Sequence, residues 1–304
     1  MSEIRHFLDL DMLNFSSLRQ ILGLASKIKD DYKSGKEFRP LLGKYLVCIF
    51  EKPSTRTRVS FQIGIQQLGG SAVIISDDQS HMGRKESLAD TARVLSRYAD
   101  GIMMRTDDPR KIYELAKYAS VPVINGLTDA SHPCQIMADI MTYEEHRGNI
   151  KNKKVAWSGD GNNVVNSWIH AAVRFGFSLK IGCPQNHKPN SDIVEWGIKK
   201  GGDIEVCASA GEAIENADLV LTDTWISMGD DNVASRREAL KPFQVDQSLM
   251  DIASPDAIFM HCLPANRGEE VTKDVIDGEQ SVVWDEAENR LHVQKGILSW
   301  CLET

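Results

Sequence analysis

The chain has 304 residues, a length that favours two domains of ordinary size over one. Its apolar content of 42% and charged content of 26% are typical of a soluble globular protein. The net charge of −8 argues against nucleic acid or an anionic membrane surface as a partner.

The cysteines and the N-terminus bear on the compartment. The six cysteines are scattered and form no C-x-x-C pair, which favours a reducing cytoplasm over a disulfide scaffold. Residues 1–7 lack the basic-then-apolar pattern of a signal peptide, and no apolar run approaches the ~18 residues needed to span a membrane. We therefore expect a cytoplasmic protein without a membrane partner.

Strands and helices alternate along the first half of the chain. Ser17 and Gln20 form a capping-box pattern that predicts a helix running to about Lys33. The apolar run Tyr45–Phe50 is typical of a strand buried on both faces, and a helix is predicted after Ser54. The other expected elements are strands at 72–75, 102–104 and 121–124 and helices at 86–99 and 109–119.

A predicted helix at 133–147 precedes a second alternation. There we expect strands at 155–157, 179–183, 204–207, 219–222, 258–261 and 282–284, and helices at 164–175, 210–216 and 290–301. Strands that alternate with long helices imply parallel sheets covered on both faces. The predicted fold class is α/β, with two domains that each hold a parallel β-sheet flanked by helices, joined by linking helices. Residues 230–244 are predicted to form a mobile loop.

The turn after the first strand has the chemistry of an anion receptor. Ser54 lies where the helix should begin and is a preferred N-cap residue. The amides of Thr55, Arg56 and Thr57 have no acceptor within the helix and lie at the positive end of its dipole. With three hydroxyls and the side chains of Arg56 and Arg58 added, the turn suits a phosphate dianion. The alternative is a well-capped surface helix, but capping alone does not require so many anion donors.

Polar residues also follow the other predicted strands, where open parallel sheets bind their ligands. These residues are Arg105, Asn125-Gly126, His132 to Gln135, Gly159 to Asn163, Asp223 to Trp225 and Cys262 to Pro264. Their clustering predicts a site between the two halves of the chain.

Nucleotide binding is disfavoured by the details of the glycine-rich turn. Gly159-Asp160-Gly161 follows a strand, but the third glycine of G-x-G-x-x-G would fall at Val164. The acidic residue expected about 20 positions on is missing, and no Walker A motif occurs. Asn162-Asn163 instead begin the next helix, where they can hold a carboxylate or an amino group.

Two histidines and one cysteine are candidates for chemistry. His132 and His261 have no partner at a recognised zinc-site spacing, so we expect no metal. For His261 a hydrogen-bonded structural role is favoured, whereas His132 opens a helix and can donate to a carbonyl oxygen. Cys262 needs an activating base to act as a nucleophile, and His261 lies on the opposite strand face. A thiol that contacts a ligand is therefore the favoured reading.

Four motifs together resemble the transcarbamoylases, and in particular their ornithine branch. The motifs are Ser54-Thr55-Arg56-Thr57-Arg58, His132-Pro133-Cys134-Gln135, Asp223-x-x-x-Ser227-Met228-Gly229 and His261-Cys262-Leu263-Pro264. The resemblance extends from about Phe50 to Arg290. It implies transfer of a carbamoyl group from carbamoyl phosphate to the δ-amino group of L-ornithine, giving L-citrulline and phosphate. It implies no metal and no organic cofactor.

The resemblance also implies residue roles. The implied carbamoyl-phosphate contacts are Ser54, Thr55, Arg56, Thr57, His81, Arg105, His132, Gln135, Cys262, Leu263 and Arg290. The implied ornithine contacts are Asn163, Asp223, Ser227 and Met228, and the implied catalytic residues are Arg105, His132, Asp223 and Cys262.

The family suggests an organisation as well. We expect a carbamoyl-phosphate domain at 1–132, an interdomain helix at 133–148, an ornithine domain at 149–285, and a C-terminal helix at 286–304 that packs back on the first domain. A homotrimer with sites at the subunit interfaces is expected, with residues 77–83 reaching the neighbouring site. Closure of residues 225–240 over bound ornithine is also expected.

Two alternatives stay open. A related transcarbamoylase would use putrescine or an acylated ornithine, although Ser227-Met228-Gly229 resembles the family's loop for a free α-amino acid. A non-catalytic sensor of a phosphorylated metabolite would be expected to lack Arg105, His132 or Cys262, and all three are present. We prefer a role in arginine biosynthesis, although the motifs do not distinguish biosynthesis from arginine breakdown.

Overall fold

The computed structural model describes residues 4–76, 86–226 and 232–303. The chain divides into two compact units, which we call unit 1 (residues 1–138 and 289–304) and unit 2 (residues 139–288). Both divisions fall inside helices, α5 (Pro133–Arg147) and α12 (Val283–Leu302), so each of these helices contributes to both units. The domain boundaries predicted above stay predictions.

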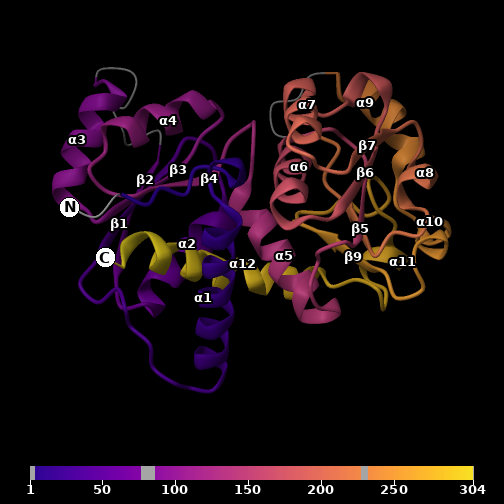
Figure 1. Cartoon of the computed structure of the whole chain (residues 1–304). Coiled ribbons are helices and arrows are strands. Elements are labelled where there is room, and N and C mark those ends of the chain that lie inside the picture. Colours follow the sequence, from indigo (N-terminus) through magenta and orange to yellow (C-terminus); the bar gives the residue numbers. More distant parts are fainter. Residues whose placement is uncertain (1–3, 77–85, 227–231, 304) are drawn as a thin grey trace. The chain divides into compact units, whose positions relative to one another are not determined.

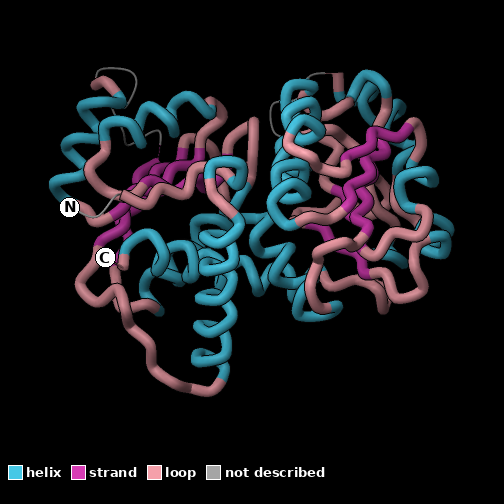
Figure 2. The backbone as a smooth tube through the Cα atoms, in the orientation of Figure 1, coloured by secondary structure: helices cyan, strands magenta, loops and turns pink. Residues whose placement is uncertain are grey.

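Unit 1 is built on a four-stranded parallel sheet in the order β2-β1-β3-β4 (Figure 1). Helices α3 and α4 cover one face of this sheet, and α1 and α2 cover the other (Figure 2). The strands are β1 (Tyr45–Phe50), β2 (Ser71–Ser76), β3 (Gly101–Arg105) and β4 (Val123–Leu127). The helices are α1 (Phe15–Lys33), α2 (Thr55–Gln67), α3 (Leu88–Tyr98) and α4 (Pro109–Tyr118), with a 3₁₀ turn η1 (Leu10–Met12).

Unit 2 holds a five-stranded parallel sheet in the order β7-β6-β5-β8-β9. Helices α6 and α7 lie on one face, and α8, α10 and α11 on the other (Figures 1 and 2). The strands are β5 (Lys154–Ser158), β6 (Ser178–Gly182), β7 (Ile204–Cys207), β8 (Leu219–Thr222) and β9 (Ile258–His261). The helical elements are α6 (Asn163–Phe175), η3 (Gln185–His187), α7 (Ser191–Lys199), α8 (Ala210–Ile214), α9 (Val233–Leu240), η4 (Lys241–Phe243), α10 (Gln247–Ile252) and α11 (Lys273–Ile276). The α/β fold predicted from the alternating pattern is confirmed.

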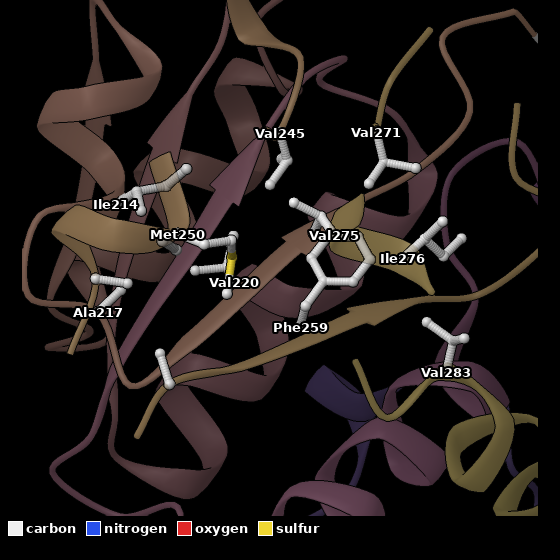
Figure 3. Close-up of a cluster of buried hydrophobic side chains, with 13 residues drawn as sticks. Ile214, Ala217, Val220, Val245, Met250, Phe259, Val271, Val275, Ile276 and Val283 are labelled. Atoms are coloured by element: carbon white, nitrogen blue, oxygen red, sulfur yellow. The ribbon is translucent and has the colours of Figure 1, made fainter. Parts of the chain in front are cut away.

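Each sheet has its own buried core. In unit 1, Ile49 and Ile102 from neighbouring strands pack with Leu115 of α4. In unit 2, Val220 and Phe259 pack with Val275 of α11 under the second sheet (Figure 3). Fully burying one such side chain stabilises the fold by ~1.5–3 kcal/mol. These cores hold the strand ends, and therefore the residues that follow them, in place. Among the described residues, no helix is both long enough and apolar enough to cross a membrane.

Three predictions about local structure are wrong. Helix α1 begins at Phe15 rather than after Ser17, because Asn14 is the cap and its side chain accepts from the Ser17 amide at 2.9 Å. The predicted strand at 282–284 is helical from Val283 onward. The predicted loop at 230–244 forms α9 and η4 over residues 233–243, while residues 230–231 lie outside the described residues.

The error at 282–284 has a simple cause. A short apolar run fits a buried strand and a buried helix end equally well, so periodicity alone does not separate them at 282–284. Helices α7, α10 and α11 were not predicted either; α10 and α11 have six and four residues, too few to show a helical period.

Candidate active site

The first turn of α2 leaves its amides available for a ligand. Ser54 occupies the N-cap position with extended backbone, but its side chain caps no amide of the helix. Its hydroxyl oxygen instead accepts from Arg105 Nη1 at 3.0 Å. Because the first intrahelical bond is from the Arg58 amide to Ser54, the amides of Thr55, Arg56 and Thr57 have no acceptor in the helix. The sequence prediction of an anion-binding turn therefore has the expected geometry.

A backbone irregularity places Arg105 beside this turn. Arg105 is the last residue of β3, and the β3–β4 register shifts there, so that Met104 pairs with Asn125 while Arg105 pairs with Leu127. Gly126 is the skipped residue, and a Cβ on it would lie 2.5 Å from Met103 Sδ. Bulges commonly redirect a side chain next to a site. Here Arg105 Nη1 also donates to Thr57 Oγ1 at 2.9 Å.

Arg290 joins the same cluster from α12. Its Nη1 donates to Gln135 Oε1 at 3.0 Å, and its Nη2 donates to Thr57 Oγ1 and lies 3.4 Å from His132 Nε2. Arg290, Gln135, His132 and Thr57 are each 5% exposed or less. All belong to unit 1, although Arg290 follows Gln135 by 155 positions.

The electrostatics of the cluster are strongly positive. Burial lowers the pKa of His132 well below its usual value, and the charges of Arg290, Arg105 and Arg56 lower it further. His132 is therefore neutral at pH 7 and offers one N–H donor and one acceptor. Three guanidinium groups beside unpaired helix amides are suited to a doubly charged phosphate group.

In unit 2, two strand ends bring Asp223 and Cys262 together. Strands β8 and β9 are parallel neighbours with Thr222 paired to His261, so the next residue of each strand falls at the same sheet edge. The Cys262 thiol donates to Asp223 Oδ1 at 3.2 Å.

The Cys262 thiol is held in its neutral form. Burial raises its pKa well above the usual value, and the negative charges of Asp223 and Glu286 raise it further. A thiolate is the nucleophilic form of cysteine, so this environment disfavours nucleophilic attack by Cys262. The prediction of a ligand-contacting thiol is consistent with this arrangement.

His261 has the structural role predicted for it. It is 1% exposed, and its Nδ1 accepts from the Leu263 amide at 2.9 Å. Nε2 therefore carries the proton and lies 3.2 Å from Glu270 Oε1. Asp223, His261 and Cys262 lie close enough to share a cation, but both His261 nitrogens are engaged and Cys262 is a neutral thiol, so the donor set is poorly suited to one.

Two residues near Cys262 were missed by sequence reasoning. Glu286 accepts from the His261 amide at 2.8 Å, and its pKa is raised well above the usual value by burial and then by the charge of Asp139. Neither Glu286 nor Asp139 lies in a motif or at a strand end. Asn162 was noted as a possible ligand contact, but its side-chain amide donates to Asp223 Oδ2 at 2.7 Å.

The predicted site residues thus fall into two groups. Unit 2 holds Asp223, Cys262, Leu263 and the partly buried Asn163. Unit 1 holds the other described contacts predicted for carbamoyl phosphate, which are Ser54, Thr55, Arg56, Thr57, Arg105, His132, Gln135 and Arg290. The predicted contacts His81, Ser227 and Met228 lie outside the described residues.

Both units match family models. Residues 5–145 match the carbamoyl-P binding domain of aspartate/ornithine carbamoyltransferases, and residues 151–301 match the Asp/Orn binding domain. The chain belongs to the aspartate/ornithine carbamoyltransferase family. It is therefore a carbamoyltransferase.

Individual relatives match nearly the whole of the carbamoyltransferase chain. Ornithine carbamoyltransferase from Rhodopseudomonas palustris is 55% identical over 302 residues, covering 98% of this chain and 97% of the relative. The solved structure of ornithine carbamoyltransferase from Pyrococcus furiosus superposes with a TM-score of 0.94 at 47% identity, covering 98% of this chain and 97% of that one. An anabolic ornithine carbamoyltransferase from Campylobacter jejuni gives a TM-score of 0.91 at 36% identity, covering 98% and 99%.

Proposed function

We propose that this carbamoyltransferase transfers the carbamoyl group of carbamoyl phosphate to the δ-amino group of L-ornithine, producing L-citrulline and phosphate. The observation that carries the proposal is the Asp223–Cys262 pair at the sheet edge of unit 2, in a chain whose unit 1 gathers Arg105, Arg290 and Thr57 in a cluster suited to phosphate. The names of the Rhodopseudomonas and Pyrococcus relatives support ornithine as the acceptor.

The phosphate of the donor would bind at the first turn of α2. There the amides of Thr55, Arg56 and Thr57, the Ser54 hydroxyl and the Arg56 guanidinium are the donors. Arg105 would contact both the phosphate and the carbonyl oxygen, with Arg290 alongside. Gln135 would accept from the carbamoyl amide, and the predicted contacts of Cys262 and Leu263 would complete the donor site.

The carbonyl carbon is the electrophile. Negative charge grows on the carbonyl oxygen as the amine attacks, and Arg105, His132 and Thr57 are the groups proposed to stabilise it. One donor of this kind typically contributes ~3 kcal/mol to the transition state. Because His132 is neutral, it would act as a hydrogen-bond donor rather than as a proton source.

The acceptor amine must lose a proton before or during attack. An alkyl amine has a pKa of about 10.4, so deprotonation at pH 7 costs roughly 4.6 kcal/mol. Asp223 would orient the amine and accept its proton, directly or through the departing phosphate. The new C–N bond forms as the C–O bond to phosphate breaks. Asn163, Ser227 and Met228 are the remaining proposed ornithine contacts.

Acceptor competition tests this assignment. Initial rates of citrulline formation from L-ornithine would be compared with carbamoylation of putrescine and of N-acetylornithine at equal concentrations. We expect ornithine to be preferred by at least about 100-fold, since a site that holds a charged α-amino acid group discriminates strongly against its absence. Faster carbamoylation of putrescine or of the acylated compound would indicate a transcarbamoylase for that acceptor. Binding of carbamoyl phosphate without turnover would indicate a non-catalytic sensor.

We also infer a homotrimer with shared sites. Exposed apolar side chains on α2, α3 and the edge strand β2 support an interface on unit 1; they are Val59, Ile63, Val73 and Val94, exposed by 40–50%. His81 of one subunit would contact carbamoyl phosphate bound to the next. Mixing inactive His81→Ala and Arg105→Ala chains should then restore part of the activity, and mixtures without recovery would argue against shared sites.

The proposed setting is arginine biosynthesis in the cytoplasm. All six cysteines are free, which supports a reducing compartment. The Campylobacter relative is described as anabolic, which supports the biosynthetic direction. Comparison of citrulline synthesis with citrulline phosphorolysis tests the direction.

A further inference from the structure

We propose that Asn162 is a positioning residue for Asp223, and that its side chain fixes the carboxylate that receives the acceptor amine. This inference rests on the proposed role of Asp223. Asn162 precedes α6, and its side chain makes three hydrogen bonds. Two of them cap the helix, and the third joins the helix start to the end of β8.

The orientation of the Asn162 amide follows from its partners. Oδ1 accepts from the Val164 amide at 2.9 Å and from the Val165 amide at 3.3 Å, and backbone amides can only donate. The NH₂ group therefore faces Asp223 Oδ2, 2.7 Å away. This distance is typical of a hydrogen bond to an ionised acceptor.

Asp223 is consequently held at both oxygens. Asn162 binds Oδ2, and the Cys262 thiol binds Oδ1. Two donors on different elements fix the plane of the carboxylate as well as its distance from the sheet edge. An amine would then meet the carboxylate in one orientation, without the cost of ordering it first.

The backbone around Asn162 is itself fixed, so the residue cannot easily turn away. The Gly161 amide donates to His187 O at 2.8 Å, and a Cβ on Gly161 would lie 2.2 Å from the Lys188 carbonyl carbon. Gly159 has a φ of +134°, and its amide donates to Gly182 O at 3.0 Å. The glycines that resembled a dinucleotide motif therefore serve to bring Asn162 to Asp223.

Two substitutions separate capping from positioning. Serine and aspartate are both good N-caps, so Asn162→Ser and Asn162→Asp keep the helix start. Serine is too short to cap and to reach Asp223 together, and aspartate sets a like charge against Asp223. Asn190, which caps α7 through the Asp192 amide in the same unit, provides the matched control Asn190→Ser.

We expect Asn162→Ser to lower kcat/KM for ornithine by about 10- to 100-fold, the effect of losing one hydrogen bond to a charged group. Asn162→Asp should lower it at least as far, and its Tm should fall as well, because two carboxylates would then face each other. The KM for carbamoyl phosphate should stay within about twofold of wild type, because its proposed ligands remain. Asn190→Ser, which loses no bond to Asp223, should keep wild-type kinetics.

A double-mutant cycle tests whether Asn162 acts through Asp223. In an Asp223→Asn background, Asn162→Ser should change kcat/KM by less than about twofold, since the group it positions is already altered. Full activity of Asn162→Asp, or equal losses with and without Asp223, would overturn the inference. If wild-type enzyme carbamoylates ornithine and the Asn162 variants do so equally well, only this inference fails. If wild-type enzyme makes no citrulline, the proposed function fails, and the inference fails as well because it rests on that function.

Discussion

Arg290 donates to Gln135 at 3.0 Å, so the last helix of the chain supplies a buried cation to a cluster of unit 1 whose other members lie at or before residue 135. The same guanidinium also bonds Thr57. A planar fork with several donors holds two acceptors at once, which a lysine cannot reproduce.

We therefore expect Arg290→Gln to raise the KM for carbamoyl phosphate by about 100-fold, the scale of one lost charged contact. Arg290→Lys should fall between this variant and wild type. Arg110, an exposed arginine of unit 1 paired with Asp108, gives the control Arg110→Gln. Steady-state kinetics with carbamoyl phosphate varied provide the measurement, and an unchanged KM in Arg290→Gln would remove Arg290 from the proposed site.

The lowered pKa of His132 predicts a pH dependence of stability. His132 binds its proton less readily in the folded protein than in the unfolded chain, where its pKa is about 6.5. Below that pH the unfolded state takes up more protons, so the free energy of unfolding falls as pH decreases. The stability that His132 contributes is thus present above pH ~6.5 and is lost as pH falls toward its folded pKa, with a slope of at most about 1.4 kcal/mol per pH unit.

Replacing His132 with Asn should flatten that slope. Urea unfolding of wild type and His132→Asn would be compared at several pH values from 7 down to 5. His146→Asn is the control, since the His146 side chain is 32% exposed and pairs with Asp285. Equal slopes for wild type and His132→Asn would show that His132 is protonated equally in both states.

How far the sequence predicts the site depends on where each residue lies. Residues at or just after strand ends, such as Arg105 and Asp223, are predictable because the ends of parallel strands lie at one edge of the sheet. Arg290 lies mid-helix, and only the family resemblance indicated it. Asp139 and Glu286 carry no signal, because a carboxylate in a helix is ordinary and its burial becomes visible only in the packed structure. For the fold, the long periodic elements were predicted, whereas the start of α1, the short run at 282–284 and the helices within 233–243 were not.

Arg236 is expected to be important for the stability of unit 2. Its side chain donates to Asp160, to the Trp225 carbonyl oxygen at 2.6 Å, and lies 3.2 Å from His187 Nδ1. Asp160 is 6% exposed, so Arg236→Ala leaves a buried carboxylate without this cation. We expect a loss of roughly 3 kcal/mol in the free energy of unfolding, measured in urea.

The neighbouring Arg237 provides a matched comparison on the same helix. It pairs with Glu269 at 2.8 Å but is 52% exposed, so Arg237→Ala should cost less than about 1 kcal/mol. Adding Asp160→Asn to Arg236→Ala should recover part of the loss by removing the buried charge. Equal destabilisation by the two alanine variants would show that burial of Asp160 does not set the cost.

Substitutions of Cys262 distinguish a thiol that orients Asp223 from a thiol that acts as a nucleophile. Its raised pKa and its hydrogen bond to Asp223 predict that Cys262→Ser, which still has a donor, keeps kcat within about tenfold of wild type. Cys262→Ala removes the donor to Oδ1 and should lose more. If Cys262 formed a covalent intermediate, both variants would lose at least about 1,000-fold, as triad enzymes do when the nucleophile is removed. Rapid-quench mass spectrometry of wild type during turnover is the direct measurement: we expect unmodified Cys262 at every time point, and a carbamoylated Cys262 would refute the direct transfer proposed for this site.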